Sequence, residues 1–116
     1  MNSLVLLIIL YYTYKNKEKI IELSSEKTKI MIKEKKIKTI LDVRSQKEFK
    51  KGHYPNAINI PIEPINKINE KNISNLKEPI LIYCRSGRRA KNAAKIIKNL
   101  GKNELYIINR TYKSLL

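Results

Sequence analysis

The chain has a single cysteine, Cys84, and its neighbours favour chemistry over packing. It follows a continuous apolar run, residues 80–83, and precedes a stretch in which alanines and isoleucines recur at helical spacing. The loop that joins strand to helix carries the groups that could hold an anion: Arg85, Ser86, Gly87, Arg88 and Arg89. A helix N-terminus and cationic neighbours stabilise a thiolate. Cys84 is therefore predicted to be a nucleophile that attacks an anionic substrate.

The same cysteine count limits the other kinds of site. A lone cysteine cannot form an intramolecular disulfide, and it excludes a cysteine-rich metal site. His53 has no Cys or His companion at metal-ligand spacing, so a hydrogen-bonded structural histidine is favoured over a catalytic one. The sequence thus predicts neither a metal nor a cofactor.

Short apolar runs alternate with stretches of helical periodicity, which is typical of an α/β fold with a largely parallel sheet. The predicted strands are Ile20–Leu23, Thr39–Val43, Ala57–Ile60, Ile80–Tyr83 and Leu105–Ile108. Helices are expected from Ser24 or Ser25 to about Lys36, over residues 46–51, from about Ala90 to Gly101, and as one closing turn. The stretch from Pro61 to Glu78 gives no firm prediction. In such sheets ligands bind beyond the carboxyl ends of the strands, where Cys84 is expected.

Three blocks of residues resemble the rhodanese family, over nearly all of residues 20–116. Residues 41–44, Leu-Asp-Val-Arg, followed by Glu48 and Phe49, look like its Asp-Val-Arg block. Residues 52–61 look like its Gly-His-x-Pro-Gly-Ala block, and residues 83–90 look like its active loop. Asn56 replaces a family glycine but tolerates left-handed backbone geometry. After the last strand Asn109-Arg110-Thr111-Tyr112 stands where the family often has a Gly-Gly pair and an aromatic, and Tyr112 could supply an aromatic lid.

The resemblance implies a rhodanese-like α/β fold with an open parallel five-stranded sheet and helices on both faces. It also implies a sulfurtransferase in which Cys84 takes sulfane sulfur from a thiosulfate-like donor as a persulfide and passes it to a thiol or cyanide. Arg85 and Arg89 would help sulfite to leave. Asp42 would either brace the active loop or cap the next turn. Arg44 is a second supporting residue, which could pair with Glu48.

Two other functions stay open. The cysteine phosphatases and arsenate reductases, related by fold, need an arginine six positions after the cysteine, and position 90 is alanine. The spacing of Arg89 matches the shorter sulfurtransferase loop instead. In the second alternative the chain is a sulfur relay or binding module that takes sulfur from a protein donor and turns over small donors slowly.

Residues 1–19 form an apolar N-terminal segment with a basic end, and the predicted domain begins at Ile20. Residues 4–14 are apolar and close on three tyrosines, with Lys15, Lys17 and Lys19 behind them. As a helix these eleven residues span only about 16 Å of a hydrocarbon core of about 30 Å. The segment is predicted to attach the domain to the cytoplasmic face of a membrane; the alternative is a helix packed on the domain or a partner in a soluble cytoplasmic protein.

The net charge of +15 favours an anionic partner, either a membrane surface or a small anionic donor. The lysines are scattered, with no basic stripe interleaved with aromatic residues and no recognition motif. Binding to nucleic acid is therefore not expected.

Overall fold

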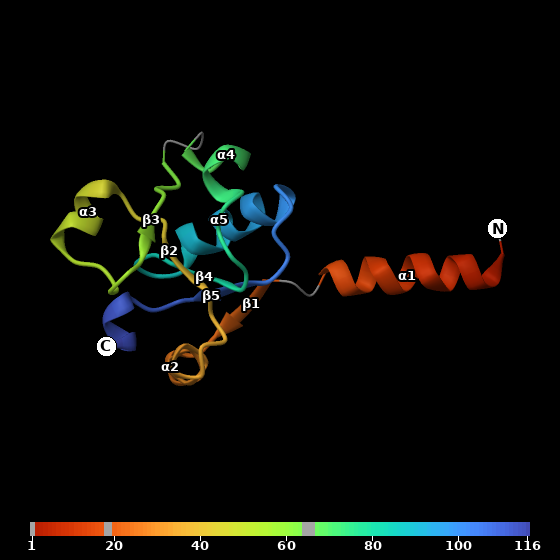
Figure 1. The fold of residues 1–116 in the computed structure, drawn as a ribbon, viewed down its shortest axis with the longest axis horizontal. Helices are drawn as coiled ribbons and strands as arrows, with labels where there is room; N and C mark the ends of the chain where they lie inside the picture. The colour runs from red at the N-terminus through yellow and green to blue at the C-terminus, as the bar shows by residue number, and fades with distance from the viewer. Residues whose placement is uncertain (1, 18–19, 64–66) are drawn as a thin grey trace.

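The structure is a computed structural model that describes residues 2–17, 20–63 and 67–116. Its centre is a sheet of five parallel strands in the order β1-β5-β4-β2-β3 (Figure 1). The strands are β1 (Ile20–Leu23), β2 (Thr39–Asp42), β3 (Ile58–Asn59), β4 (Ile80–Tyr83) and β5 (Leu105–Ile108). Each lies within a predicted run, although β2 ends one residue early and β3 is shorter than expected. The predicted open parallel sheet is confirmed.

Helices cover both faces of this sheet, as predicted (Figure 1). On one face lie α2 (Ser25–Lys33) and the short 3-10 helix η2 (Tyr112–Leu115), joined by a hydrogen bond of 2.8 Å between Ser25 Oγ and Ser114 Oγ. On the other face lie α4 (Glu70–Ile73) and α5 (Arg88–Asn99). The helix α3 (Gln46–Lys51) connects β2 to β3.

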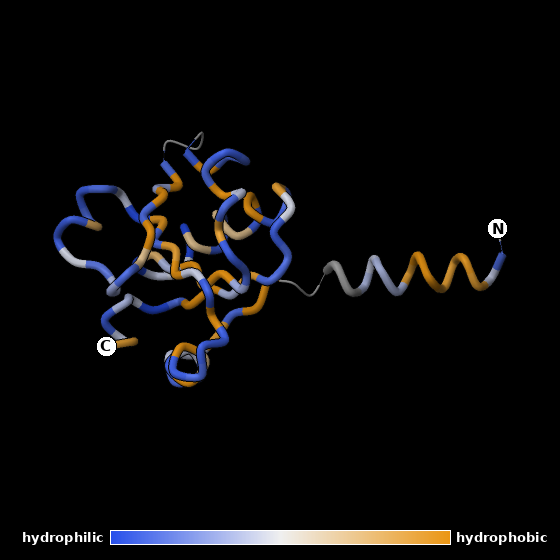
Figure 2. The backbone as a smooth tube through the Cα atoms, in the orientation of Figure 1, coloured by the Kyte–Doolittle hydropathy of each residue, from blue (hydrophilic) through white to orange (hydrophobic). Residues whose placement is uncertain are grey.

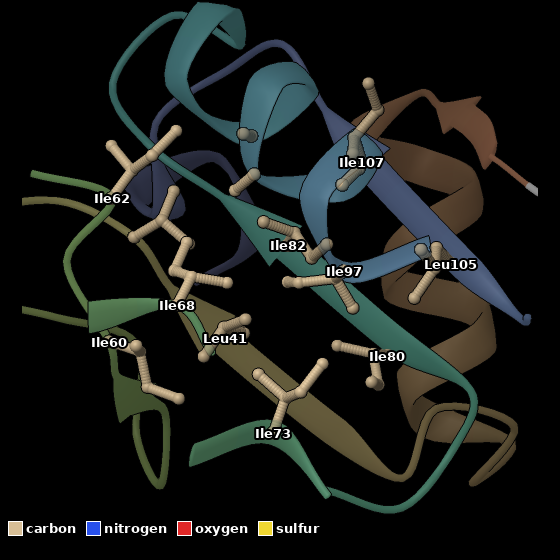
Figure 3. Packing of buried hydrophobic residues seen from close by; sticks show 14 of the residues in the cluster. Leu41, Ile60, Ile62, Ile68, Ile73, Ile80, Ile82, Ile97, Leu105 and Ile107 are labelled. Atoms are coloured by element: carbon tan, nitrogen blue, oxygen red, sulfur yellow. The ribbon is translucent and has the colours of Figure 1, made fainter. Parts of the chain in front are cut away.

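Strand β4 is buried along its whole length because both of its faces are covered. Ile80 and Ile82 belong to the larger apolar cluster beneath α5, where they pack with Ile97 (Figure 3). Leu81 and Tyr83 belong to the cluster on the opposite face. The side of α5 against the sheet carries Ala90, Ala93 and Ala94, whose small side chains let the helix lie close. Packing on two sides thus fixes the strand that ends at Cys84.

Local capping explains most helix boundaries. Ser24 caps α2, and Ser45 with Glu48 forms a capping box at the start of α3. Helix α2 ends at Lys33 rather than near Lys36, because Lys35 takes a left-handed backbone (φ 58°) in a Schellman motif. Asn56 is also left-handed (φ 66°), as expected of a residue in place of glycine.

The N-terminal helix α1 (Ser3–Lys17) extends away from the sheet domain (Figure 1). Its apolar side chains from Leu4 to Leu10 are 45–63% exposed, and they are not confined to one side of the helix. The apolar residues follow one another along successive turns of α1 (Figure 2). The alternative in which this helix packs on its own domain is therefore wrong. Among the helices described, none has the length and apolar character needed to cross a membrane.

Matched isoleucine-to-alanine substitutions test the packing of β4. Ile82→Ala should lower the free energy of unfolding by about 2–5 kcal/mol, because the removed atoms leave a cavity under α5. Ile30→Ala is the control, since Ile30 on α2 is 53% exposed and should cost less than about 1 kcal/mol. Urea unfolding followed by circular dichroism measures both. Equal losses for the two variants would contradict this account of the core.

Candidate active site

Cys84 lies directly after β4, with its side chain only 1% exposed. Its Sγ accepts hydrogen bonds from two backbone N–H groups, Gly87 N at 3.1 Å and Ala90 N at 3.3 Å. Both donors belong to the turn that opens α5, so the positive end of that helix faces the sulfur. Two N–H donors directed at Sγ can stabilise negative charge that develops on that sulfur.

Gly87 allows the loop to turn in this way. Its φ of 96° is left-handed, and a Cβ there would lie 3.0 Å from the Cα and Cβ of Asn109, just beyond β5. A larger residue at position 87 would therefore be strained by its backbone and crowded by its neighbour. The loop owes its curvature to the glycine and its position to the end of β5.

Asp42 is fully buried at the carboxyl end of β2, next to the end of β4. Its carboxylate accepts hydrogen bonds from the backbone N of Arg44 (2.9 Å), the Arg44 guanidinium (2.7–3.1 Å) and the hydroxyl of Tyr83 (2.7 Å). Tyr83 Oη also accepts from the backbone N of Tyr54 at 3.1 Å. Asp42 thus caps the turn after β2 and binds Tyr83, the last residue of β4, which directly precedes Cys84.

The same network sets the protonation of its members. The hydrogen bond from Arg44 to Asp42 is the main cause of the raised pKa of the guanidinium. Burial is the main cause of the raised pKa of Tyr83, with the Asp42 hydrogen bond adding to it. Tyr83 therefore stays protonated at neutral pH and keeps donating to the carboxylate.

Arg44 connects the hydrogen-bond network of Asp42 to Tyr112 in the C-terminal segment. Its guanidinium lies 5.1 Å from the ring centroid of Tyr112 and 5.6 Å from that of Tyr83. It also donates a 2.7 Å hydrogen bond to the carbonyl of Gly52. A side chain at position 52 would collide with the Tyr112 hydroxyl, so the glycine leaves room for that ring. Tyr112 is held beside the site by a cation–π contact.

Glu48 pairs with Arg89, and the sequence interpretation in which Glu48 pairs with Arg44 is wrong. Arg89 Nη1 and Nη2 donate to the two carboxylate oxygens at 2.6 and 3.0 Å. Arg44 pairs with Asp42 instead. The same carboxylate also accepts a hydrogen bond from Tyr83, forty-one residues further along the chain. The Glu48–Arg89 pair ties α3 to the first turn of α5, beside the cysteine loop.

Cys84 opens to a cleft of about 240 Å³, and the loop residues divide between two hollows. The cleft is lined by Arg44, Glu48, Cys84, Arg85, Thr111, Tyr112 and Lys113. The predicted binding residues Ser86, Arg88 and Arg89 instead line a neighbouring hollow of about 360 Å³. A larger hollow of about 640 Å³ lies between Glu22 and Ser114 and does not include the cysteine. Of the predicted anion-binding side chains, only Arg85 shares the cleft with Cys84.

Sequence reasoning missed Thr111 and Lys113 in this cleft. They follow β5, the neighbour of β4, so the rule that ligands gather at the carboxyl ends of parallel strands could have pointed to them. His53 lies outside the lining and has a structural setting. Its Nδ1 lies 2.8 Å from the Phe49 carbonyl, and the two rings stack with centroids 3.7 Å apart. Across the described ranges of the chain, no three His, Cys, Asp or Glu side chains gather as a metal site would require.

Residues 24–115 match the Rhodanese-like domain family. The chain belongs to the rhodanese family. The rhodanese fold is matched by the crystal structure of BH2092 from Bacillus halodurans, with a TM-score of 0.68 and 28% identity over 91% of this chain and 77% of that one.

Two curated relatives of this rhodanese chain have names that refer to sulfur. It is 34% identical over 90 residues to "Putative sulfur carrier protein YrkF" of Bacillus subtilis, covering 78% of this chain and 48% of that protein. It is 33% identical over 73 residues to "Putative thiosulfate sulfurtransferase, mitochondrial" of Schizosaccharomyces pombe, covering 53% and 51%. The chain therefore spans about half the length of the curated relatives it matches.

The Glu48–Arg89 pair predicts a particular acid sensitivity. The hydrogen bond from Arg89, supported by those with Ser45, lowers the pKa of Glu48 from 4.5 to about 2. A lowered pKa stabilises the fold above the unfolded-state value, and this contribution is lost as the pH falls from about 4.5 to about 2. Wild type should therefore lose its stability advantage over Glu48→Gln across this window.

The measurement is urea unfolding of both proteins at pH values from 2 to 7. Comparison with the isosteric amide isolates Glu48, because every other carboxyl group is the same in the two proteins. A stability difference that stays constant across the whole range would contradict the assigned ion pair.

Proposed function

We propose that this rhodanese domain transfers sulfane sulfur from a thiosulfate-like donor to a thiol or cyanide through a persulfide on Cys84. The observation that carries the proposal is the pair of backbone N–H groups directed at Cys84 Sγ, at the base of a cleft lined by cationic side chains. The family membership and the sulfur-related names of the relatives support it.

In the first step the Cys84 thiolate attacks the outer sulfur of thiosulfate. A new S–S bond forms to Cys84 while the sulfur–sulfur bond of the donor breaks, and sulfite leaves with the bonding electron pair. The cysteine thereby becomes an anionic persulfide, so charge and atoms balance. In the second step the acceptor attacks the outer sulfur of the persulfide and the Cys84 thiolate is regenerated.

The loop amides would stabilise the Cys84 thiolate, both before the donor arrives and as a leaving group in the second step, because the turn holds Gly87 N and Ala90 N beside Sγ. Arg85 would bind the donor's anionic group within the cleft. Arg89 would act indirectly, since Glu48 already occupies its guanidinium. Asp42 and Arg44 would support the site by fixing the turn after β2 and the ring of Tyr112.

Persulfide formation on Cys84 can be detected directly by mass. After incubation with thiosulfate, intact-mass spectrometry of the wild-type protein should show one added sulfur atom, which dithiothreitol removes. Cys84→Ser should show no addition, because a hydroxyl lacks the nucleophilicity of a thiolate. The chain has no other cysteine, so the adduct can be assigned without a digest. An unmodified wild-type protein would argue against transfer from thiosulfate.

The same assay separates enzyme from relay. A sulfur relay would receive its persulfide from a protein donor such as a cysteine desulfurase, and the carrier name of one relative favours that alternative. Rapid conversion of thiosulfate and cyanide to thiocyanate and sulfite would support the enzyme. Persulfide loading by a desulfurase together with no loading by thiosulfate would support the relay.

We also propose that α1 attaches the domain to the cytoplasmic face of a membrane by entering one leaflet. Its apolar side chains are exposed all round the helix, and lysines 15, 17 and 19 follow them in the sequence. Apolar burial and attraction to anionic lipid add, and each lysine near such a surface contributes about 1 kcal/mol.

Deletion of residues 1–19 tests this attachment and the domain boundary together. The full chain should sediment with vesicles that contain anionic lipid, whereas the truncated protein should stay in the supernatant. Persulfide formation on Cys84 should be unchanged, because β1 begins at Ile20 and the site uses no residue of α1. A full-length protein that ignores the vesicles would refute the attachment, and a truncated protein that misfolds would refute the boundary.

A further inference from the structure

The C-terminal helix η2 brings a second uncompensated cation to the cleft. Arg85 and Lys113 line it together with Cys84, and the side chains of both are exposed. In the part of the chain that the structure describes, neither takes part in an ion pair. Both charges are therefore available to a molecule that enters the cleft.

The remaining charges of the cleft cancel within the protein. Arg44 is neutralised by Asp42 at 2.7 Å. Glu48, the one acidic residue in the cleft lining, is neutralised by Arg89 at 2.6 Å. The cleft thus presents Arg85 and Lys113 as its free charges, and both are positive. A ligand with two negative charges would match them.

Lys113 is held at this place by its neighbours on both sides. The Tyr112 ring lies on Arg44, and the side chain of Leu115 is 6% exposed in the core beneath η2. Ser114 bonds to Ser25 across the face of the domain. The backbone of η2 is therefore anchored to both α2 and the site, while the ammonium group of Lys113 remains in solvent at the mouth of the cleft.

We propose that Lys113 is a substrate-binding residue that acts with Arg85 to bind the anionic part of the molecule that reacts with Cys84, and that this pair favours a sulfur donor carrying two negative charges. The preference for a dianionic donor rests on the proposed sulfur transfer. Thiosulfate has that charge at neutral pH, whereas organic persulfides and polysulfides of lower charge would gain less from the second cation.

The test compares Lys113→Met with Lys113→Arg and with the charge-matched control Lys95→Met, since Lys95 is exposed on α5 and lines neither the cleft nor the neighbouring hollow. The first readout is kcat/KM for thiosulfate. Lys113→Met should lower it about fivefold through KM, as expected for loss of one partly screened charge, and Lys113→Arg should retain it. Lys95→Met should match wild type.

The second readout needs no sulfur transfer. Iodoacetate and iodoacetamide alkylate the Cys84 thiolate by the same displacement of iodide, and only iodoacetate is an anion. The ratio of their rates should fall in Lys113→Met and stay unchanged in Lys95→Met. Equal ratios in these two variants would overturn the proposal. The wild-type protein could also fail to take sulfur from thiosulfate while the alkylation ratio still falls in Lys113→Met. That result would uphold anion binding by Lys113 and refute the proposed function alone.

Discussion

The site depends on the hydrogen bonds that the buried carboxylate of Asp42 accepts from Arg44 and Tyr83. A fully buried charge is costly unless it is paired and hydrogen-bonded, and Asp42 meets this requirement with donors from the turn after β2 and from the end of β4. The strands β2 and β4 are neighbours, so the carboxylate fixes their ends relative to each other. Cys84 directly follows Tyr83, which donates a hydrogen bond to this carboxylate. The Asp42 network therefore helps to fix the backbone that carries the sulfur.

Two ion pairs separate the cationic residues of the site into those that are paired within the protein and those that are not. Arg44 and Arg89 each bind a carboxylate. The Arg44–Asp42 pair lies within the turn after β2, whereas the Arg89–Glu48 pair joins α5 to α3, which are distant in sequence. Arg85 and Lys113 bind no carboxylate among the described residues. A count of arginines near the cysteine would therefore overstate the positive field in the cleft, because two of these arginines are neutralised by the carboxylates of Asp42 and Glu48.

The sequence predicts the strands, the position of Cys84 and the glycine turn, because each depends on residues close together in the chain. Ile80–Tyr83 is a continuous apolar run, and only a strand covered on both faces buries it all. The partner of Glu48 could not be obtained in that way. Its spacing of four residues from Arg44 suggests a local pair, but Arg44 binds Asp42 and Glu48 binds Arg89, which the fold brings in from α5. Lys113 was missed for the same reason, since its place in the cleft depends on η2 folding back beside β4.

The single cysteine also constrains the order of events in the proposed sulfur transfer. In the proposed transfer, a persulfide on Cys84 would have no second thiol in this sequence with which to form a disulfide, so its sulfur would leave to another molecule. Cys84 is almost completely buried and meets solvent at a cleft of about 240 Å³. If the proposed transfer takes place here, the product of the first half-reaction would leave this cleft before the acceptor enters, which is a ping-pong sequence with a covalent enzyme form between the two substrates. Donor and acceptor would then compete for one entrance, and an excess of either substrate would inhibit the reaction by binding the form of the protein that reacts with the other.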